Sequence, residues 1–168
     1  MRVIVLSILL LTAGISLADI INIPEDHETI QGGMDAAEDG DTVLVQPGTY
    51  VENIIFDHKG ITVGSLTLMT DDRVYIDSTI IDGDEQSCVV AFLDYTHLDS
   101  LQGQSRPVLR GFTIRNGLQN YGGGIDCQLH SRPVLQDLLI TDNTAVQGGG
   151  GICTSSESFG HIRHFAKL

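Results

Sequence analysis

The stretch "IDGDEQS" (81–87) gathers carboxylates around a glycine turn. Asp82, Asp84 and Glu85 offer oxygen ligands, which are the ligands that a hard cation such as Ca²⁺ prefers. A turn that follows an apolar strand also recruits Asp and Gly for their backbone conformation alone. The stretch therefore predicts either a calcium site formed by these three side chains or a structural turn, and the sequence suggests no cofactor other than Ca²⁺.

Two arginines and a pair of aspartates could extend this chemistry. Arg110 and Arg115 flank the strand that we expect to stack over the turn, so they form either an acid–base cluster with its carboxylates or solvated rim charges. Asp71 and Asp72 are adjacent, and adjacent side chains of a strand face opposite sides. We therefore expect this pair to cap a turn rather than to act together on a substrate.

A third group of polar residues recurs at a fixed distance. Asn116 and Asp142 stand 26 residues apart, and Asn143 lies beside the second. Asn and Asp side chains stacked at successive turns can hydrogen-bond one another and the turn backbone. We expect a structural polar ladder here, with a ligand site as the alternative.

The distance of 26 residues reflects an internal repeat. The stretch "SRPVLRGFTIRNG" (105–117) returns as "SRPVLQDLLITDN" (131–143), and an ungapped alignment of 105–130 with 131–156 gives ten identities. Repeats of about 20 to 50 residues are typical of solenoids. Each copy is rich in Leu and β-branched residues and lacks a helical period, so it predicts short strands joined by turns. Strands that return in parallel, without a crossover helix, form a β-helix with levels about 4.8 Å apart.

Earlier segments fit the same pattern with less regular spacing. Short apolar runs bounded by turn residues occur at 41–48, 51–57, 60–65, 78–83 and 88–94. The polar stretch 95–105 is expected to form a loop between two levels. The predicted fold is therefore all-β, with parallel β-helix levels over 41–158.

The segment 19–40 has a different period. Ile30, Met34 and Ala37 recur with helical spacing between Thr29, a good N-cap, and Gly40, a common stop signal. We expect a short amphipathic helix over 29–39. Such a helix would cover the open core of the first level, which has no neighbour below it.

The chain begins with signals for export. Arg2 precedes an apolar run, and Ser16-Leu17-Ala18 provides a small-x-small cleavage site, so residues 1–18 predict a secretory signal peptide. The run is shorter than the about 20 apolar residues that cross a bilayer, so we expect no integral membrane span. An uncleaved anchor is the alternative. We expect a secreted protein that is extracellular or at the cell surface.

The net charge and the cysteine spacing limit which binding partners and metal sites the sequence predicts. The formal net charge of −13 and the pI of about 4.5 argue against binding to nucleic acid, because a polyanion would be repelled. Cys88, Cys127 and Cys153 match no zinc pattern, and whether any two form a disulfide is left open.

A family resemblance becomes specific at this point. The stretch "IPEDHETIQGGMDAAEDGDTVLVQPGTYVENI" (23–54) is followed by "GITVGS", "STIIDG", "GFTIRNG", "GGGIDC" and "GGGGIC". Over about 24–158 the chain resembles the secreted bacterial parallel β-helix proteins of the pectin-lyase-like superfamily. The resemblance implies a right-handed parallel β-helix (a solenoid) with a short N-terminal capping α-helix. It leaves the activity open, because that superfamily includes lyases, hydrolases, esterases and surface proteins with no known reaction.

The enzyme motifs of that superfamily are incomplete in this chain. "GTYVE" (48–52) fits a stretch near the start of pectin methylesterases, but their later motifs are absent, and a structural role for Tyr50 is the simpler interpretation. We therefore predict no complete catalytic site and an exported module with a structural or glycan-contacting role. Its partner would be a polysaccharide or a cell-surface glycan. The alternative is the N-terminal fragment of a polysaccharide-acting enzyme of the pectate lyase, polygalacturonase or pectinesterase type.

The repeat fails near the end of the sequence. Continued with a period of 26, it predicts apolar residues where Gly160, His161 and His164 stand. We therefore expect 159–168 to be an irregular tail of a truncated chain. An uncapped last level would expose apolar side chains and an unpaired strand edge, so we also expect self-association through that end.

Overall fold

The computed structural model describes residues 18–93, 106–128, 131–155 and, for the backbone, 161–166. The predicted signal peptide (1–18), apart from Ala18, and the predicted loop (95–105) lie outside the described residues. In the described part of the chain, no helix is long and apolar enough to cross a membrane.

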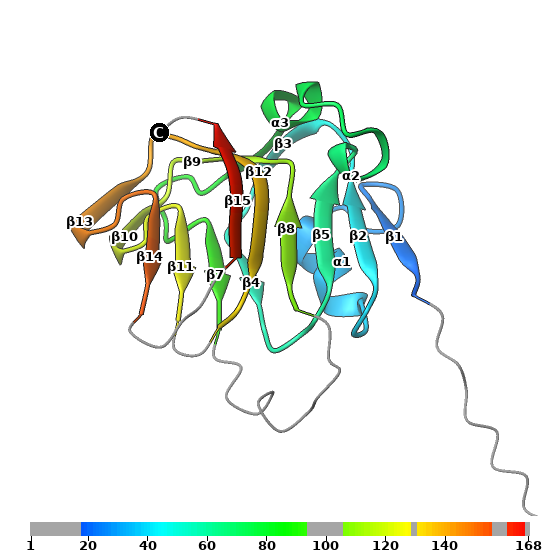
Figure 1. The fold of residues 1–168 in the computed structure, drawn as a ribbon, viewed down its shortest axis with the longest axis horizontal. Coiled ribbons are helices and arrows are strands. Elements are labelled where there is room, and N and C mark those ends of the chain that lie inside the picture. The colour runs from blue at the N-terminus through cyan, green and yellow to red at the C-terminus, as the bar shows by residue number, and fades with distance from the viewer. Residues whose placement is uncertain (1–17, 94–105, 129–130, 156–160, 167–168) are drawn as a thin grey trace, which may run out of the picture.

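The strands form three columns in which every pairing is parallel (Figure 1). The first column contains β1 (Ile20–Ile23), β2 (Thr42–Val45), β5 (Thr62–Ser65), β8 (Val108–Arg110), the first half of β12 (Val134–Ile140) and β15 (His161–Ala166). The second contains β3 (Gly48–Val51), β6 (Thr79–Asp82), β9 (Thr113–Arg115) and the second half of β12. The third contains β4 (Ile54–Phe56), β7 (Val90–Phe92), β11 (Ile125–Cys127) and β14 (Ile152–Thr154).

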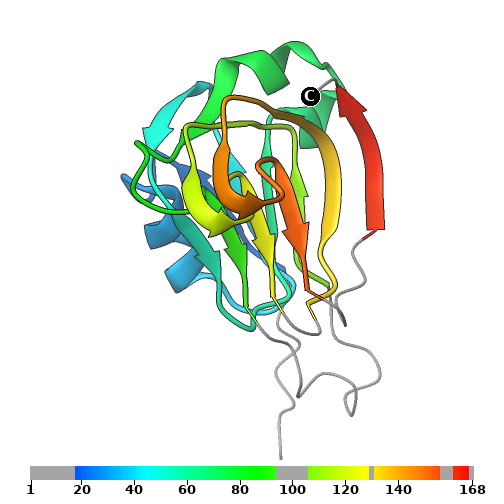
Figure 2. The ribbon, with the colours of Figure 1, turned by 90° about the vertical axis from the view of Figure 1, so that its left-hand side faces the viewer.

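A separate two-stranded ribbon pairs β10 (Leu118–Tyr121) with β13 (Thr144–Gly148). The chain visits the columns in the same order on each pass, so strands that are neighbours in a sheet come from successive passes. None of the sheets closes on itself within the described residues. Figure 2, which looks at the molecule from the side of β13 and β14, shows the passes one behind another. This mostly parallel β architecture is consistent with a β-helix-like fold.

The core lies between the columns and consists of inward-facing side chains at equivalent positions. In the first column Val63, Leu109 and Leu135 are opposite one another and almost completely buried. In the third column Phe56 and Phe92 stack with their ring centroids 4.4 Å apart. Burial of each such side chain contributes about 1.5–3 kcal/mol to stability. Aliphatic side chains and a few Phe rings therefore form a stable core in a chain that contains no Trp.

The N-terminal helix forms as the sequence predicts, although it is shorter. Helix α1 (Ile30–Ala36) begins after Thr29, whose hydroxyl accepts a hydrogen bond from the Gly32 amide at 3.0 Å. The side chains of Ile30, Met34 and Ala37 are buried in the core. The helix ends before the predicted residue 39 because Ala37 takes an extended backbone conformation.

The stretch between β5 and β6 forms two short helices, α2 (Thr67–Thr70) and α3 (Val74–Ser78), where the sequence predicted only a turn. Asp71 ends α2 in the left-handed conformation, and the Asp72 carboxylate accepts a hydrogen bond from the Val74 amide at 3.0 Å. The predicted capping role of Asp71 and Asp72 is therefore confirmed. We call residues 66–78 the helical insert.

The predicted irregular tail, 159–168, needs correction for the residues of β15. This strand pairs in parallel with β12, with His161 opposite Val134. The sequence argument failed because it continued a period of 26, whereas β13 carries one extra residue between Ala145 and Gly148, and the period is 27 from there on, as the pairings of Tyr121 with Gly148 and of Ile125 with Ile152 show. In the longer register, residue 162 stands opposite Leu135.

Candidate functional site

The three predicted calcium ligands lie at the end of β6, but they do not converge on one point. The Asp82 carboxylate accepts hydrogen bonds from Arg115 Nε at 2.8 Å and from Asn116 Nδ2 at 2.9 and 3.0 Å. It also accepts one from the Asp84 amide at 3.2 Å. Asp82 is 8% exposed, and its oxygens are already engaged by protein donors.

Asp84 and Glu85 contribute their backbone rather than their carboxylates to this turn. Both residues are in the left-handed conformation, with φ of 49° and 55°, and both side chains are exposed. The Glu85 amide donates to the Asn116 carbonyl at 2.7 Å. Within the described residues no group of three or more His, Cys, Asp or Glu side chains could hold a metal ion. The geometry gives the calcium hypothesis no support, and it stays an untested prediction.

The surroundings of Asp82 favour its charged form. Burial alone would raise the pKa of Asp82, but hydrogen bonds from Asn116, Arg115 and the Asp84 amide, with the positive charge of Arg115, outweigh burial and lower that pKa. Arg115 is 37% exposed at its side chain, so this ion pair lies at the edge of the protein. Of the two alternatives for Arg115, the structure shows the ion pair with this turn, formed by a guanidinium that stays partly exposed at the rim.

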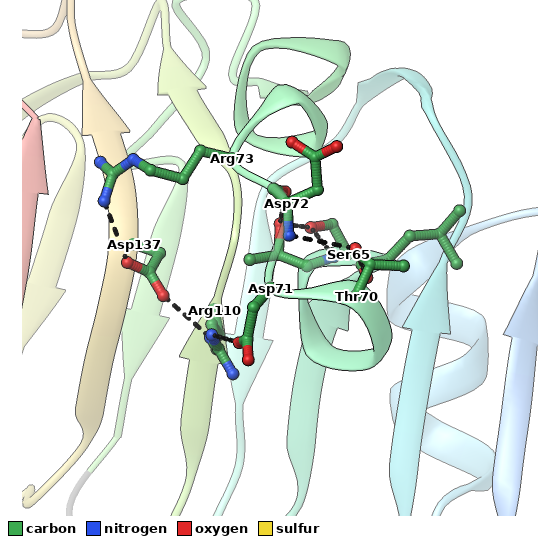
Figure 3. Close-up of polar contacts among 9 residues, drawn as sticks. Ser65, Thr70, Asp71, Asp72, Arg73, Arg110 and Asp137 are labelled. Atoms are coloured by element: carbon green, nitrogen blue, oxygen red, sulfur yellow. Dashed lines mark hydrogen bonds and ion pairs between the residues drawn. The ribbon is translucent and has the colours of Figure 1, made fainter.

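Arg110 does not join Asp82. Its Nε donates to Asp137 Oδ2 at 2.9 Å, and its Nη2 donates to Asp71 Oδ1 (Figure 3). Arg73 Nη1 approaches the other Asp137 oxygen at 3.5 Å. The four side chains alternate in charge across the outer face of β8 and β12 and the edge of the helical insert, and we call them the Arg110 row: Arg73, Asp137, Arg110 and Asp71.

The ends of the Arg110 row are open to solvent and its centre is not. The side chains of Asp137 and Arg110 are 13% and 22% exposed, whereas those of Arg73 and Asp71 are 55% and 82% exposed. Burial would lower the pKa of Arg110, but hydrogen bonds to Asp71 and Asp137 outweigh burial and raise that pKa. The row therefore presents fixed donors and acceptors at its two ends.

Backbone conformation positions the centre of the row. Asp137 lies within β12 in the left-handed conformation, with φ of 50°, where the preceding repeat has Gly111 with φ of 85°. The helical insert is anchored over the same face because the Thr113 hydroxyl donates to the Ile76 carbonyl at 2.8 Å. Sequence reasoning missed the row because two of its members, Asp71 and Arg73, lie in an insert outside the repeat. The signal in the sequence that could have pointed to the row is the alignment of Asp137 with Gly111 across the two repeats.

The "GTYVE" stretch has a structural role. Tyr50 donates to the Gln46 carbonyl at 2.9 Å, and the Glu52 carboxylate accepts from the amides of Ile30 and Gln31 at 2.9 and 3.0 Å. Glu52 thus fixes the start of α1 over the first pass. The simpler interpretation of this motif is confirmed for these residues.

The predicted polar ladder forms in part: Asp142 meets Asn116 through its backbone carbonyl, which accepts from the Asn116 amide at 3.1 Å. Besides the bonds of Asn116 to Asp82, Asn143 Nδ2 donates to the Ile114 carbonyl at 2.9 Å and its Oδ1 accepts from the Gly117 amide at 2.8 Å. Asn143 therefore satisfies the backbone of the preceding pass, whereas Asn116 bonds to the Asp82 carboxylate of its own preceding pass. The ladder is part of the scaffold.

The cysteines contribute no disulfide. None of the three takes part in a disulfide: Cys88 and Cys127 are buried, and Cys153 is half-buried. The lengthened period places Cys153 opposite Asp126 rather than opposite Cys127, so the two thiols leave the sheet on opposite sides. Burial, with the nearby charges of Asp126 and Cys153, raises the pKa of the Cys127 thiol to about 12.

Comparison with known proteins adds no relative. No family model matches the chain, and no curated protein matches it. The function must therefore be argued from the geometry.

Proposed function

We propose that the chain is a right-handed parallel β-helix that acts, after export, as a glycan-contacting surface module without a complete catalytic site. The fixed order in which the chain visits the three columns supports the coiled path. Connections between parallel strands of one sheet are right-handed in the great majority of proteins, which supports the handedness. The resemblance to the pectin-lyase-like superfamily remains part of this proposal.

The Arg110 row is the observation that carries the proposal. A sugar presents hydroxyls that both donate and accept, so a surface that contacts it needs both kinds of group at fixed positions. Arg73 offers guanidinium donors and Asp71 offers carboxylate acceptors, and both are more than half exposed. The ion pairs with Arg110 and Asp137 hold these two groups in place, which lowers the entropy lost on binding.

Glycoside hydrolysis requires two carboxyl groups that flank the bond to be cleaved, one of them protonated as a general acid. The carboxylates of the Arg110 row each meet an arginine. Burial raises the pKa of Asp126, as a general acid would need, but the residues opposite it are Ala91 and Cys153. We therefore favour contact with a glycan over its cleavage.

A binding measurement tests the contact. Fluorescently labelled oligogalacturonate and cello-oligosaccharide, as an acidic and a neutral probe, would be titrated with the mature chain and with Arg73→Gln. We expect one probe to bind and Arg73→Gln to weaken it about tenfold, the effect of losing one charge-assisted hydrogen bond. Arg106→Gln is the matched control, because Arg106 is exposed and outside the row. Binding of neither probe, or equal loss in both variants, would refute the assignment.

An activity assay tests the second part of the proposal. We expect the mature chain, with Ca²⁺ at pH values from about 5 to 9, to neither cleave nor de-esterify polygalacturonate. Turnover that is lost in Asp82→Asn or Arg115→Gln would show that the turn after β6 is catalytic and would replace the proposal by the enzyme alternative.

A further inference from the structure

An Asn or Asp precedes a glycine at three places in the chain: Asp39-Gly40, Asp82-Gly83 and Asn116-Gly117. At such a pair the glycine nitrogen can attack the side-chain carbonyl carbon of the residue before it, because glycine has no Cβ that hinders the approach. A neutral carboxamide accepts this attack more readily than an ionised carboxylate, which repels the nucleophile. Asn116-Gly117 is therefore the most reactive of the three pairs by residue type.

The stacked passes fix both residues of this pair. Gly117 is buried, and an added Cβ would meet the carbonyl of Gly123, so the packing requires glycine there. Asn116 is in the left-handed conformation, with φ of 56°. Its amide donates to the Asp142 carbonyl at 3.1 Å, and its carbonyl accepts from the Glu85 amide at 2.7 Å. The fold therefore retains a chemically reactive pair at this turn.

The reacting groups of the pair are held in opposite directions. Asn116 Nδ2, the leaving group, donates to the two Asp82 carboxylate oxygens at 2.9 and 3.0 Å. The Gly117 amide, the nucleophile, donates to Asn143 Oδ1 at 2.8 Å. Because β6, β9 and β12 are neighbours in that order, Asp82 belongs to the preceding pass and Asn143 to the following pass. Ring closure at Asn116 therefore requires both contacts to open.

The other two pairs are held in a different way. The Gly40 and Gly83 amides donate to backbone carbonyls, at 3.1 and 2.9 Å. Of the three pairs, all of which lie in the described part of the chain, only Gly117 donates to a side chain. A substitution of Asn143 can therefore release this nitrogen without a change in the backbone.

We propose that Asn116 is the site at which this chain deamidates spontaneously, and that Asn143 limits the rate by holding the Gly117 nitrogen. When the turn opens, the Gly117 nitrogen loses its proton to solvent and attacks Cγ of Asn116. The Cγ–Nδ2 bond breaks, and the leaving nitrogen takes a proton from water and departs as ammonia. Water then opens the cyclic imide at either carbonyl and leaves aspartate or isoaspartate. This inference is independent of the Arg110 row, of export and of glycan contact.

The product would loosen the turn after β6. Conversion replaces the Nδ2 donor of Asn116 by a carboxylate that faces the Asp82 carboxylate, and two like charges at that distance repel one another. Since the ammonia is lost, the change is not reversed when the turn closes. The converted fraction therefore records how long the turn has been open. Asn116→Asp, which makes this product directly, should lower the melting temperature by about 2–4 °C or more.

Peptide mapping by mass spectrometry, after incubation of the mature chain at mildly alkaline pH, measures conversion at each site. Asn116 should convert about 20-fold or more slowly in the folded chain than in the same chain unfolded in urea, because two hydrogen bonds must open. Asn143→Ala should speed conversion of Asn116 in the folded chain about fivefold or more, the effect of losing one of the two. Thr113→Val is the matched control: it removes another side-chain hydrogen bond to the backbone, the one to the Ile76 carbonyl at 2.8 Å, and should leave the rate unchanged.

Several outcomes would overturn the proposal. Equal acceleration in Asn143→Ala and Thr113→Val would show that conversion follows general loosening of the fold rather than release of Gly117. No acceleration in Asn143→Ala, with circular dichroism as evidence of folding, or earlier conversion at another site in that variant, would also refute it. Hydrogen exchange on the wild type gives a test without any substitution. The Gly117 amide should be protected, and exchange at the rate of the unfolded chain would contradict the proposal.

Discussion

Replacement of Asp82 by Asn tests the interpretation of the turn after β6 as a structural ion pair. Asp82→Asn keeps the shape of the side chain but removes the charge that Arg115 Nε meets at 2.8 Å. It also turns an amide NH₂ toward a group of donors. A charge-assisted hydrogen bond contributes about 1.5–3 kcal/mol. Because Arg115 is 37% exposed and can recover water, we expect a loss of about 2 kcal/mol in the free energy of unfolding, near the lower end of that range.

Thermal and urea unfolding of the mature chain measure this loss. For a domain of this size, 2 kcal/mol corresponds to a fall in the melting temperature of about 4–8 °C. Asp84→Asn is the matched control, since it removes the same charge from an exposed side chain in a left-handed conformation that Asn tolerates. We expect the control to change stability by less than about 0.5 kcal/mol. Equal effects of the two substitutions would refute the reasoning.

The pH dependence gives a second check on Asp82. Its pKa is lowered in the folded chain, so its contribution to stability is fully present above the ordinary carboxyl pKa of about 4 and is lost as pH falls through the folded value. The difference in stability between the wild type and Asp82→Asn should shrink accordingly on acidification. Millimolar Ca²⁺ should leave the melting temperature unchanged. A Ca²⁺-dependent rise that Asp84→Asn abolishes would restore the calcium hypothesis.

Three further substitutions and one labelling reaction test the scaffold. Glu52→Gln should lower the free energy of unfolding by about 1 kcal/mol, measured in urea, because it removes the negative charge at the first amides of α1. Gly111→Ala should cost more than about 1 kcal/mol, since φ is 85° and an added methyl would meet Ser65 and Thr67, whereas Gly148→Ala, with open space, should cost less than about 0.5 kcal/mol. Iodoacetamide at pH 8 should label Cys153 well before Cys127, because burial and a raised pKa disfavour the Cys127 thiolate. Mass spectrometry after digestion measures the two labelling rates, and equal rates would contradict this expectation.

The sequence predicted the features that repeat. Ile114 and Ile140 match across the two copies, and the structure pairs them in adjacent parallel strands. The capping helix was predictable as well, because Thr29, Ile30 and Met34 encode a cap and an apolar face within a few residues. Local signals and a constant period were sufficient for both.

Features that break the period were not predictable in the same way. One added residue between Ala145 and Gly148 shifts all later pairings by one residue, so the tail seemed unrelated to β12 although residues 161–166 pair with it. The Arg110 row joins pairs of side chains that are 27, 39 and 64 residues apart, which no local pattern records. Only the stacking of successive passes brings Asp71, Arg110 and Asp137 together.

An experimental crystal structure of the mature chain tests the central claim, that successive passes stack as parallel levels of a β-helix, most directly. We predict that Ile81, Ile114 and Ile140 point inward from adjacent parallel strands and that His161 lies opposite Val134. Antiparallel pairing of these strands, or Ile114 and Ile140 on opposite faces of a sheet, would contradict the account.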